Sequence, residues 1–278
     1  PVAKLSIIPN NPVPNNNHLP AYVIANKQVL LDGSYSQANG SSTIIKYQWD
    51  FDGDGKYDYA EGGVVHPDGT ADGRTWRSFD STCSVSLMVT DSAGNSDKVT
   101  INVIVSADSE NSSQGDGLPD AWETLYQVSE PSSDDDSDGY NNLCEYMHGS
   151  IPKGTGASAS TPAAGVIVAH GGATPIQNAI DASIANDTII VLPGTYVESI
   201  NFSKPDRTLR SIDPDNWEIV AKTIIHDESS YDEDISIGSP ADTDTILEGF
   251  TIKGPHSFDW NGTWNGGVGL YIDGVSPV

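Results

Sequence analysis

Basic residues are scarce in this chain of 278 residues: 13 lysines and arginines stand against 39 aspartates and glutamates, so the formal net charge is −26. A surface this negative repels phosphate backbones and anionic lipids, which argues against nucleic acid and acidic membranes as partners. Folding brings these like charges closer together, and bound cations relieve the resulting repulsion. The charge balance therefore favours a protein that works with cations, in a calcium-rich extracellular or cell-surface setting.

Cysteine is also scarce. The two cysteines, Cys83 and Cys144, are too few for the disulfide framework of a small secreted domain. Cys83 alternates with Val85, Leu87 and Val89, a pattern that favours a buried thiol over a bridge between domains. Long apolar runs are absent too, because no stretch approaches the roughly 18 residues that a membrane-spanning helix needs. We therefore expect neither a disulfide scaffold nor insertion into a membrane.

The residue patterns of common catalytic sites are missing as well. No Ser/His/Asp arrangement, zinc-binding spacing or phosphate-cradling glycine loop occurs, and the six histidines are scattered. Arg210 and Lys222 are candidate electrophilic groups, but no spacing singles them out. An acidic stretch at residues 226–234 suits calcium or acid–base catalysis, although a solvated turn explains it more simply. Its carboxylates are Asp227, Glu228, Asp232, Glu233 and Asp234. We expect the chain not to be an enzyme.

Residues 19–106 show the alternation of apolar and polar residues that half-buried β-strands require. The alternating positions are Ile45, Tyr47, Trp49 and Phe51, then Cys83, Val85, Leu87 and Val89, and then Val99, Ile101, Val103 and Val105. Turn sequences such as LDGS, PDGT and DSAGNS separate these runs. The pattern predicts an antiparallel β-sandwich with Trp49 in its core.

Residues 1–18 precede the sandwich with a short apolar segment, VAKLSIIP, and a spacer rich in proline and asparagine. A spacer of this composition prefers extended conformations and does not pack. We expect an extended arm, whose apolar segment is either a strand donated to the open β-helix end of a neighbouring molecule or a frayed terminus. Such an exchange would join copies head to tail into a filament.

Residues 107–152 contain two acidic loops, each followed by a helical segment, at 118–128 and 141–149. A twelve-residue calcium loop takes ligands from positions 1, 3, 5, 7, 9 and 12, and position 6 is glycine. The loop at residues 134–145 matches this spacing, with Gly139 at position 6 and with the ligands Asp134, Asp136, Asp138, the Tyr140 carbonyl, Asn142 and Glu145. The loop at residues 112–123 supplies Ser112, Gln114, Asp116, the Leu118 carbonyl, Asp120 and Glu123. Because its first two ligands are uncharged, we expect this first site to be weaker or empty.

A third stretch, DFDGDGKYDYAE at residues 50–61, has the same spacing of Asp50, Asp52, Asp54, Asp58 and Glu61. Calcium binding is one explanation. The other is that these residues form a strand end and turn of the sandwich, where a strand aims alternate carboxylates apart. The sequence leaves both explanations open.

Residues 153–162 have the composition of a flexible linker. Residues 163–278 begin with a helical face formed by Ile176, Ala179, Ile180 and Ile184, and short apolar segments with brief polar breaks follow. Ile224, Ile246 and Tyr271 recur at intervals of 22 and 25 residues, which is typical of a coiled parallel solenoid. We expect a capping helix and about three coils, the last of them incomplete at residue 278.

Three parts of the chain resemble known families. VLLDGSYS, YQWDFDGDG and SLMVTDSAGNSD resemble the polycystic-kidney-disease (PKD) domain, which implies an immunoglobulin-like sandwich with an adhesive or spacing role. GDGLPDAWE and DSDGYNNLCEYMHGSIP resemble the paired calcium-binding linkers of secreted bacterial proteins, related in style to dockerin and thrombospondin type 3 repeats. A dockerin would bind a cohesin, but both loops here have Glu at position 12, where dockerins favour Asp. IIVLPGTYVESINF, with the helix before it, resembles the first coil of a right-handed parallel β-helix of the pectin-lyase type.

Two further features concern sugars. Phe258, Trp260 and Trp264 lie close together in sequence, and such aromatics either stack on sugar rings or anchor a long loop to the solenoid. Sequons for glycosylation in a secreted protein occur at Asn39, Asn111, Asn186, Asn201 and Asn261.

Together these features predict a mainly β protein of three modules: a sandwich, a calcium-binding loop–helix module and the first coils of a β-helix. We expect a secreted or cell-surface structural or adhesive protein, stabilised by calcium, that self-associates or binds another extracellular protein. The alternative is the N-terminal part of a carbohydrate-active β-helix enzyme, of the polysaccharide lyase or glycoside hydrolase kind, or a glycan-binding module whose partner is a polysaccharide.

Overall fold

The computed structural model describes residues 1–10, 19–57, 72–109, 115–128, 130–153, 162–202, 204–226, 235–237, 245–253 and 270–272. Several residues named above lie outside these ranges: Asp58, Glu61, Asn111, Ser112, Gln114, Phe258, Trp260, Asn261, Trp264 and the acidic stretch after His226. The chain divides into two compact units, Pro1–Pro162 with His170–Gly172, and Ala163–Ala169 with Ala173–Val278. The principal division thus falls where the predicted linker ends.

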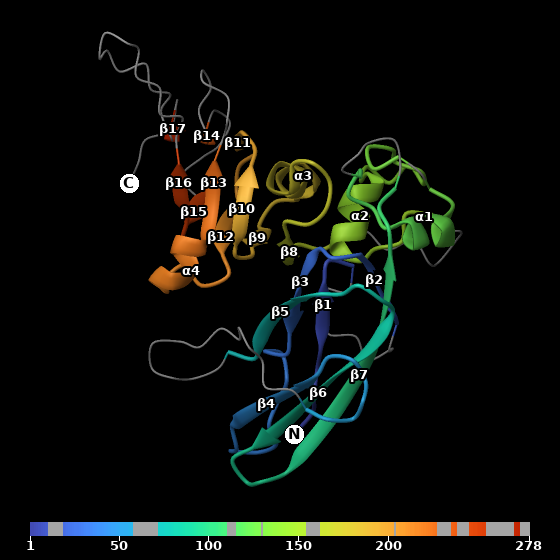
Figure 1. The fold of residues 1–278 in the computed structure, drawn as a ribbon, viewed down its shortest axis with the longest axis vertical. Helices are drawn as coiled ribbons and strands as arrows, with labels where there is room; N and C mark the ends of the chain where they lie inside the picture. Colours follow the sequence, from blue (N-terminus) through green and yellow to red (C-terminus); the bar gives the residue numbers. More distant parts are fainter. Residues whose placement is uncertain are drawn as a thin grey trace. The chain divides into compact units, whose positions relative to one another are not determined.

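The fold is mainly β, with antiparallel sheets in the first half of the chain and short parallel sheets in the second (Figure 1). In the first unit, one sheet has the order β1 (Ser6–Ile8), β3 (Gln28–Asp32) and β5 (Arg74–Ser78), all antiparallel. The other has the order β2 (Ala21–Ile24), β7 (Ser96–Ser106), β6 (Cys83–Asp91) and β4 (Ile44–Asp50). Its pairs are antiparallel except for β2 with β7.

The two sheets of the first unit share one apolar core. Leu31 of the first sheet and Leu87, Ile101 and Trp49 of the second belong to a single cluster of buried side chains. Apolar side chains that alternate along each strand face this core, as the period of two requires. The predicted burial of Trp49 is therefore confirmed.

The prediction of a free N-terminal arm is wrong for residues 1–10. Strand β1 pairs with β3, with Ile7 opposite Leu31, and Leu5 and Ile7 are fully buried in the sandwich core. The Ala3 N–H also donates a hydrogen bond to Asp97 at 2.8 Å. Alternate apolar residues of the segment fit the pleat of a sheet in their own chain, so this strand is not left over for a neighbour.

Ile45 departs from the predicted alternation. Its side chain is 63% exposed, whereas Trp49 on the same strand is buried. The register between β4 and β6 shifts between Ile44 and Lys46, as it does at a β-bulge. A bulge inserts one residue into the strand and turns the following side chains, so Ile45 faces solvent.

The two predicted helices of residues 107–152 are confirmed as α1 (Asp120–Tyr126) and α2 (Asn142–His148). Both belong to the same compact unit as the sandwich. Trp122 of α1 and Tyr146 of α2 pack edge to face, with ring centroids 5.3 Å apart. The described residues of this stretch thus pack within the same compact unit as the sandwich. Cys83 and Cys144 are both free thiols.

The second unit contains three parallel sheets. Their strand orders are β15 (Ile246–Glu248), β12 (Thr208–Ser211), β9 (Thr188–Val191) and β8 (Val166–Val168); β10 (Gly194–Val197), β13 (Thr223–His226) and β16 (Thr251–Lys253); and β11 (Ile200–Phe202), β14 (Ile235–Ile237) and β17 (Leu270–Ile272). The chain visits the three sheets in turn and then returns to the first. Each circuit through the three sheets adds one strand to each sheet, beside the strand from the circuit before. The backbone hydrogen bonds therefore connect successive circuits.

The predicted equivalence of Ile224, Ile246 and Tyr271 is wrong, because these residues lie in three different sheets. Ile224 pairs with Thr251, Ile246 pairs with Thr208, and Tyr271 pairs with Ser236. The true spacings vary widely, since turns of different length connect the stacked strands. The prediction of parallel strands in this part of the chain is confirmed, but the period of 22 and 25 residues did not give their register.

Helix α3 (Pro175–Ala182) buries Ile176, Ala179 and Ile180 of the predicted face, but it ends before Ile184, which is half-buried. The buried carboxylate of Glu198 accepts hydrogen bonds from the N–H groups of Ile176 at 3.1 Å and Gln177 at 2.9 Å, so it caps the start of this helix. The sequence analysis missed a further short helix, α4 (Trp217–Lys222). Among the described residues, every helix is too short or too polar to cross a membrane.

Candidate metal centres

The loop at residues 134–145 folds around its first aspartate. The Asp134 carboxylate accepts hydrogen bonds from the N–H groups of Asp138 at 3.2 Å and Gly139 at 3.0 Å. Gly139 has a φ of +99°, a backbone conformation that side-chain-bearing residues rarely adopt. These contacts close the loop and bring carboxylate oxygens of Asp134, Asp136 and Asp138 within 4.8 Å of one another.

Helix α2 begins inside this loop and contributes the ligands predicted at positions 9 and 12. The side chains of Asn142 and Glu145 are fully buried, each with 0% exposure. The Asn142 side-chain N–H donates to the Glu130 carbonyl at 2.8 Å, which leaves its Oδ1 as the group that has no partner. A helix start at this point fixes both side chains relative to the aspartates before it.

Three buried oxygens of this loop have no hydrogen-bond partner among the described residues: Asp136 Oδ1, Asn142 Oδ1 and Glu145 Oε2. A buried polar atom left without a partner costs about 1–3 kcal/mol, and more if it is charged. These three atoms come from positions 3, 9 and 12 of the predicted calcium loop. An oxygen-preferring cation would give all three a partner, so the donor set fits calcium.

The electrostatic environment of Glu145 also favours a bound cation. Burial raises its pKa to about 8, and the charges of Asp136, Asp138 and Asp134 add to the increase, while a hydrogen bond from Ser150 opposes it. The side chain therefore sits among like charges in a place that water does not reach. A divalent cation at the centre of these carboxylates would reverse that repulsion and hold Glu145 ionised.

The first loop uses an aspartate that the sequence analysis missed. Asp108 accepts hydrogen bonds from the N–H groups of Asp116 at 2.7 Å and Gly117 at 3.1 Å, while Asp116 accepts from the Leu118 N–H at 2.9 Å. The second loop repeats this scheme with Asp134, Asp138, Gly139 and the Tyr140 N–H. Asp108 thus occupies position 1, where the spacing predicted Ser112. The signal in the sequence was a carboxylate four residues ahead of the expected one.

The helix starts of the two loops are equivalent as well. The Asp120 N–H donates to the Ala107 carbonyl at 2.9 Å, as the Asn142 N–H donates to the Ser133 carbonyl at 2.8 Å. Each acceptor directly precedes the first aspartate of its loop. Glu123, at position 12, is only 4% exposed. The Asp120 carboxylate, however, already accepts two hydrogen bonds from Ser109, at 2.9 and 2.6 Å, so the first loop is less open to a cation.

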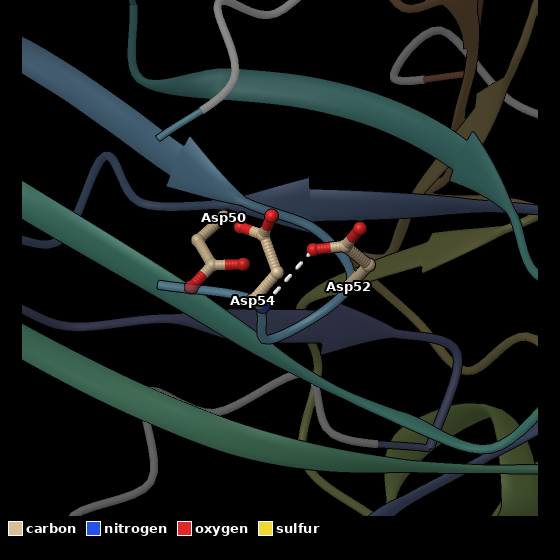
Figure 2. Close-up of side chains that lie close together, drawn as sticks. All are labelled: Asp50, Asp52 and Asp54. Atoms are coloured by element: carbon tan, nitrogen blue, oxygen red, sulfur yellow. Dashed lines mark hydrogen bonds between the residues drawn. The ribbon is translucent and has the colours of Figure 1, made fainter. Parts of the chain in front are cut away.

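Asp50, Asp52 and Asp54 form a third acidic group at the end of β4 (Figure 2). Asp50 is buried and accepts the N–H groups of Gly53 at 2.7 Å and Gly55 at 3.1 Å. Asp52 accepts the Asp54 N–H at 3.1 Å, the dashed contact in Figure 2. Their oxygens lie within 4.8 Å of one another, so the strand does not aim these carboxylates apart.

A lysine competes for this third group. Lys56 forms an ion pair with Asp54 at 2.6 Å, and its hydrogen bond lowers the pKa of Asp54. Both side chains are exposed to solvent. The group therefore already has a cation on one of its three carboxylates, whereas Asp134, Asp136 and Asp138 form no ion pair with a lysine or arginine among the described residues.

The remaining predicted residues that the structure describes do not gather into a site. Asn39, Asn186 and Asn201 are exposed and lie apart in the chain. Arg210 forms an ion pair with Glu248 at 3.3 Å on the neighbouring strand, and Lys222 ends helix α4. No family model matches this chain, and no curated protein matches its sequence.

Proposed function

We propose that residues 134–145 bind calcium and that the protein is a calcium-stabilised structural or adhesive protein outside the cell or on its surface. The observation that carries the proposal is the set of three buried oxygens on Asp136, Asn142 and Glu145 that have no partner in the part of the chain that the structure describes. They occur at the ligand positions of a calcium loop, beside the carboxylates of Asp134 and Asp138. The Tyr140 carbonyl would supply the ligand at position 7.

We propose a second, weaker calcium site in the preceding loop, with Asp108, Asp116, the Leu118 carbonyl, Asp120 and Glu123 as its ligands. The repeated hydrogen-bond scheme of the two loops supports it. The contacts between Asp120 and Ser109 favour the weaker affinity. The two loops then form a pair of EF-hand-like sites.

We also propose a fold type for each of the two units. The two-sheet sandwich, with β2 parallel to β7, supports an immunoglobulin-like domain of the PKD kind. The three-sheet connectivity of the second unit supports a parallel β-helix, and its resemblance to pectin-lyase-like proteins implies the right-handed form. These folds, the acidic surface and the calcium loops support an extracellular location and a structural role more than catalysis. A carbohydrate-active enzyme remains the alternative from the sequence, and its acidic stretch and aromatic loop lie outside the described residues.

Calcium binding is tested by isothermal titration of the wild type and of two matched variants. Asp136→Ala removes a predicted ligand, whereas Asp135→Ala removes the neighbouring carboxylate, which pairs with Lys153 at 3.4 Å. We expect Asp136→Ala to weaken the tighter site at least tenfold and Asp135→Ala to change it little. Equal calcium binding in both variants, or none in the wild type at millimolar calcium, would contradict the proposal.

Self-association is tested separately, by light scattering in millimolar calcium and after chelation. The first ten residues are not retained as the strand that joins neighbours, because Leu5 and Ile7 are buried in their own sandwich. Assemblies that dissociate on chelation would support a calcium-dependent structural role. A monomer under both conditions would remove the filament and leave a role as a spacer or as a binder of another extracellular protein.

A further inference from the structure

Helix α2 lies between the proposed calcium site and the sandwich. Its fourth residue, Glu145, is the ligand at position 12, and the next residue, Tyr146, is fully buried against other parts of the first unit. Neighbouring residues of a helix point about 100° apart, so one short helix presents Glu145 to the loop and Tyr146 elsewhere. A shift of the helix backbone at Glu145 therefore also shifts Tyr146.

Tyr146 attaches the helix to the sandwich. Its hydroxyl donates a hydrogen bond to the Tyr22 carbonyl at 3.0 Å, and Tyr22 lies on β2, paired with Ile104 of β7. Its ring packs against Trp122 of α1, with centroids 5.3 Å apart. The same side chain thus links both helices to the edge strand of a sheet.

Helix α2 is too short to be stable by itself. It has seven residues, all of them buried, and isolated helices shorter than about 12–15 residues are marginal in water. Two things hold its ends: the Asn141 side chain, which accepts the Cys144 N–H at 2.8 Å, and Gly149, which closes the C-terminus in a left-handed conformation. The rest of its stability comes from packing and from whatever occupies the loop.

Without a cation, Glu145 stays in the loop only at a cost in free energy. Glu145 is buried beside the carboxylates of Asp136 and Asp138, and its Oε2 has no hydrogen-bond partner among the described residues. This cost is relieved if the Glu145 side chain leaves the loop, and because every residue of α2 is buried, we expect that movement to carry the helix with it. That movement would withdraw the Tyr146 hydroxyl from Tyr22.

We propose that calcium in the loop at residues 134–145 controls the docking of α2 on the sandwich, with the Tyr146–Tyr22 hydrogen bond as the contact that responds. The inference rests on the proposed calcium site and adds a conformational consequence. With calcium bound, α2 is docked and β2 is protected along its edge. After chelation, α2 detaches while the core strands of the sandwich stay folded.

Hydrogen exchange of the full-length wild type, in millimolar calcium and after chelation, tests the docking directly. We expect chelation to speed exchange at least tenfold in α2 and in β2, and to leave β6, in the middle of its sheet, unchanged. This comparison needs no variant. Calcium binding with unchanged exchange in β2 would overturn the docking and leave the calcium site intact.

A variant tests the reverse direction of the coupling. Tyr146→Phe removes the hydroxyl but keeps the ring, and coupling between two sites is reciprocal, so we expect it to weaken calcium binding by about fivefold, the equivalent of one ordinary hydrogen bond. Tyr35→Phe is the control, because it removes a hydroxyl from an exposed tyrosine of the sandwich, outside both calcium loops. Wild-type affinity in Tyr146→Phe would overturn the inference, whereas no calcium binding in the wild type would overturn the proposed function and the inference together.

Discussion

Asp108 accepts the backbone N–H of Asp116 at 2.7 Å, although the two are eight positions apart in the sequence. In the second loop, the equivalent pair is Asp134 and Asp138, only four residues apart. The first loop therefore contains four additional residues between position 1 and position 5, and still closes in the same way. A longer loop costs more entropy to close, which adds to the reasons for a weaker site.

The identity of this ligand gives a direct prediction. We expect Asp108→Ala to abolish calcium binding at the weaker site while the tighter site keeps its affinity. Ser112→Ala should have no effect, because Asp108 takes the position that spacing assigned to Ser112. Titration of both variants beside the wild type measures this. Loss of the weaker site in Ser112→Ala, with none in Asp108→Ala, would restore the assignment from spacing.

Removal of calcium should lower the thermal stability of the first unit. At calcium tenfold above the dissociation constant, one site adds about 1.4 kcal/mol to the free energy of unfolding. A unit of this size shifts its midpoint by roughly 2–4 °C per kcal/mol, so we expect a decrease of about 3–6 °C per site on chelation. Scanning calorimetry with and without chelator measures it, and magnesium in place of calcium is the control. An unfolding midpoint that does not change on chelation would contradict the prediction.

The third acidic group has its own test. Lys56→Ala removes the cation that pairs with Asp54. If Asp50, Asp52 and Asp54 hold calcium, we expect this variant to bind it more tightly at the weakest site, with the site at residues 134–145 unchanged. Calcium titration followed by NMR of the Gly53 and Gly55 amides, which donate to Asp50, reports on the group directly. Unchanged amide signals in both proteins would assign these residues to the turn alone.

Glu198 should make the second unit sensitive to pH. Burial raises its pKa above the ordinary value of 4.5, although the Ile176 and Gln177 N–H groups oppose the increase. A raised pKa in the folded state means that ionisation is unfavourable there. The contribution of Glu198 to the free energy of unfolding is therefore largest below about pH 4.5, and it is lost as the pH rises through the pKa of the folded state.

The measurement is hydrogen exchange of α3, compared between the wild type and Glu198→Gln at each pH. We expect the protection factor of the α3 amides to fall with rising pH in the wild type and to stay constant in Glu198→Gln. Glu198→Ala should lose protection at every pH, by about 1–3 kcal/mol, because it leaves two N–H groups without their acceptor. A protection factor that does not change with pH in the wild type would show that Glu198 does not titrate in this range.

The sequence predicted those features that depend on residues close together in the chain. The loop at residues 134–145 is contiguous, so its spacing alone identified Asp134, Asp136 and Asp138, which the structure brings together. Asp108 was missed because its loop is longer than the standard pattern. Strand β1 was missed because it has three residues, and its partner Leu31 lies 24 positions after Ile7. No local pattern reports a pairing of that kind.

The stacked strands of the second unit show the same limit and have a consequence for how such a chain can vary. Thr208 follows its partner Thr188 by 20 residues but precedes its other partner, Ile246, by 38. The register is nevertheless kept, since hydrogen bonds between strands set it and the connecting turns lie outside the pairs. Insertions and deletions in these turns can therefore accumulate over evolution without disturbing the stack. New surface loops can be added to this scaffold one turn at a time.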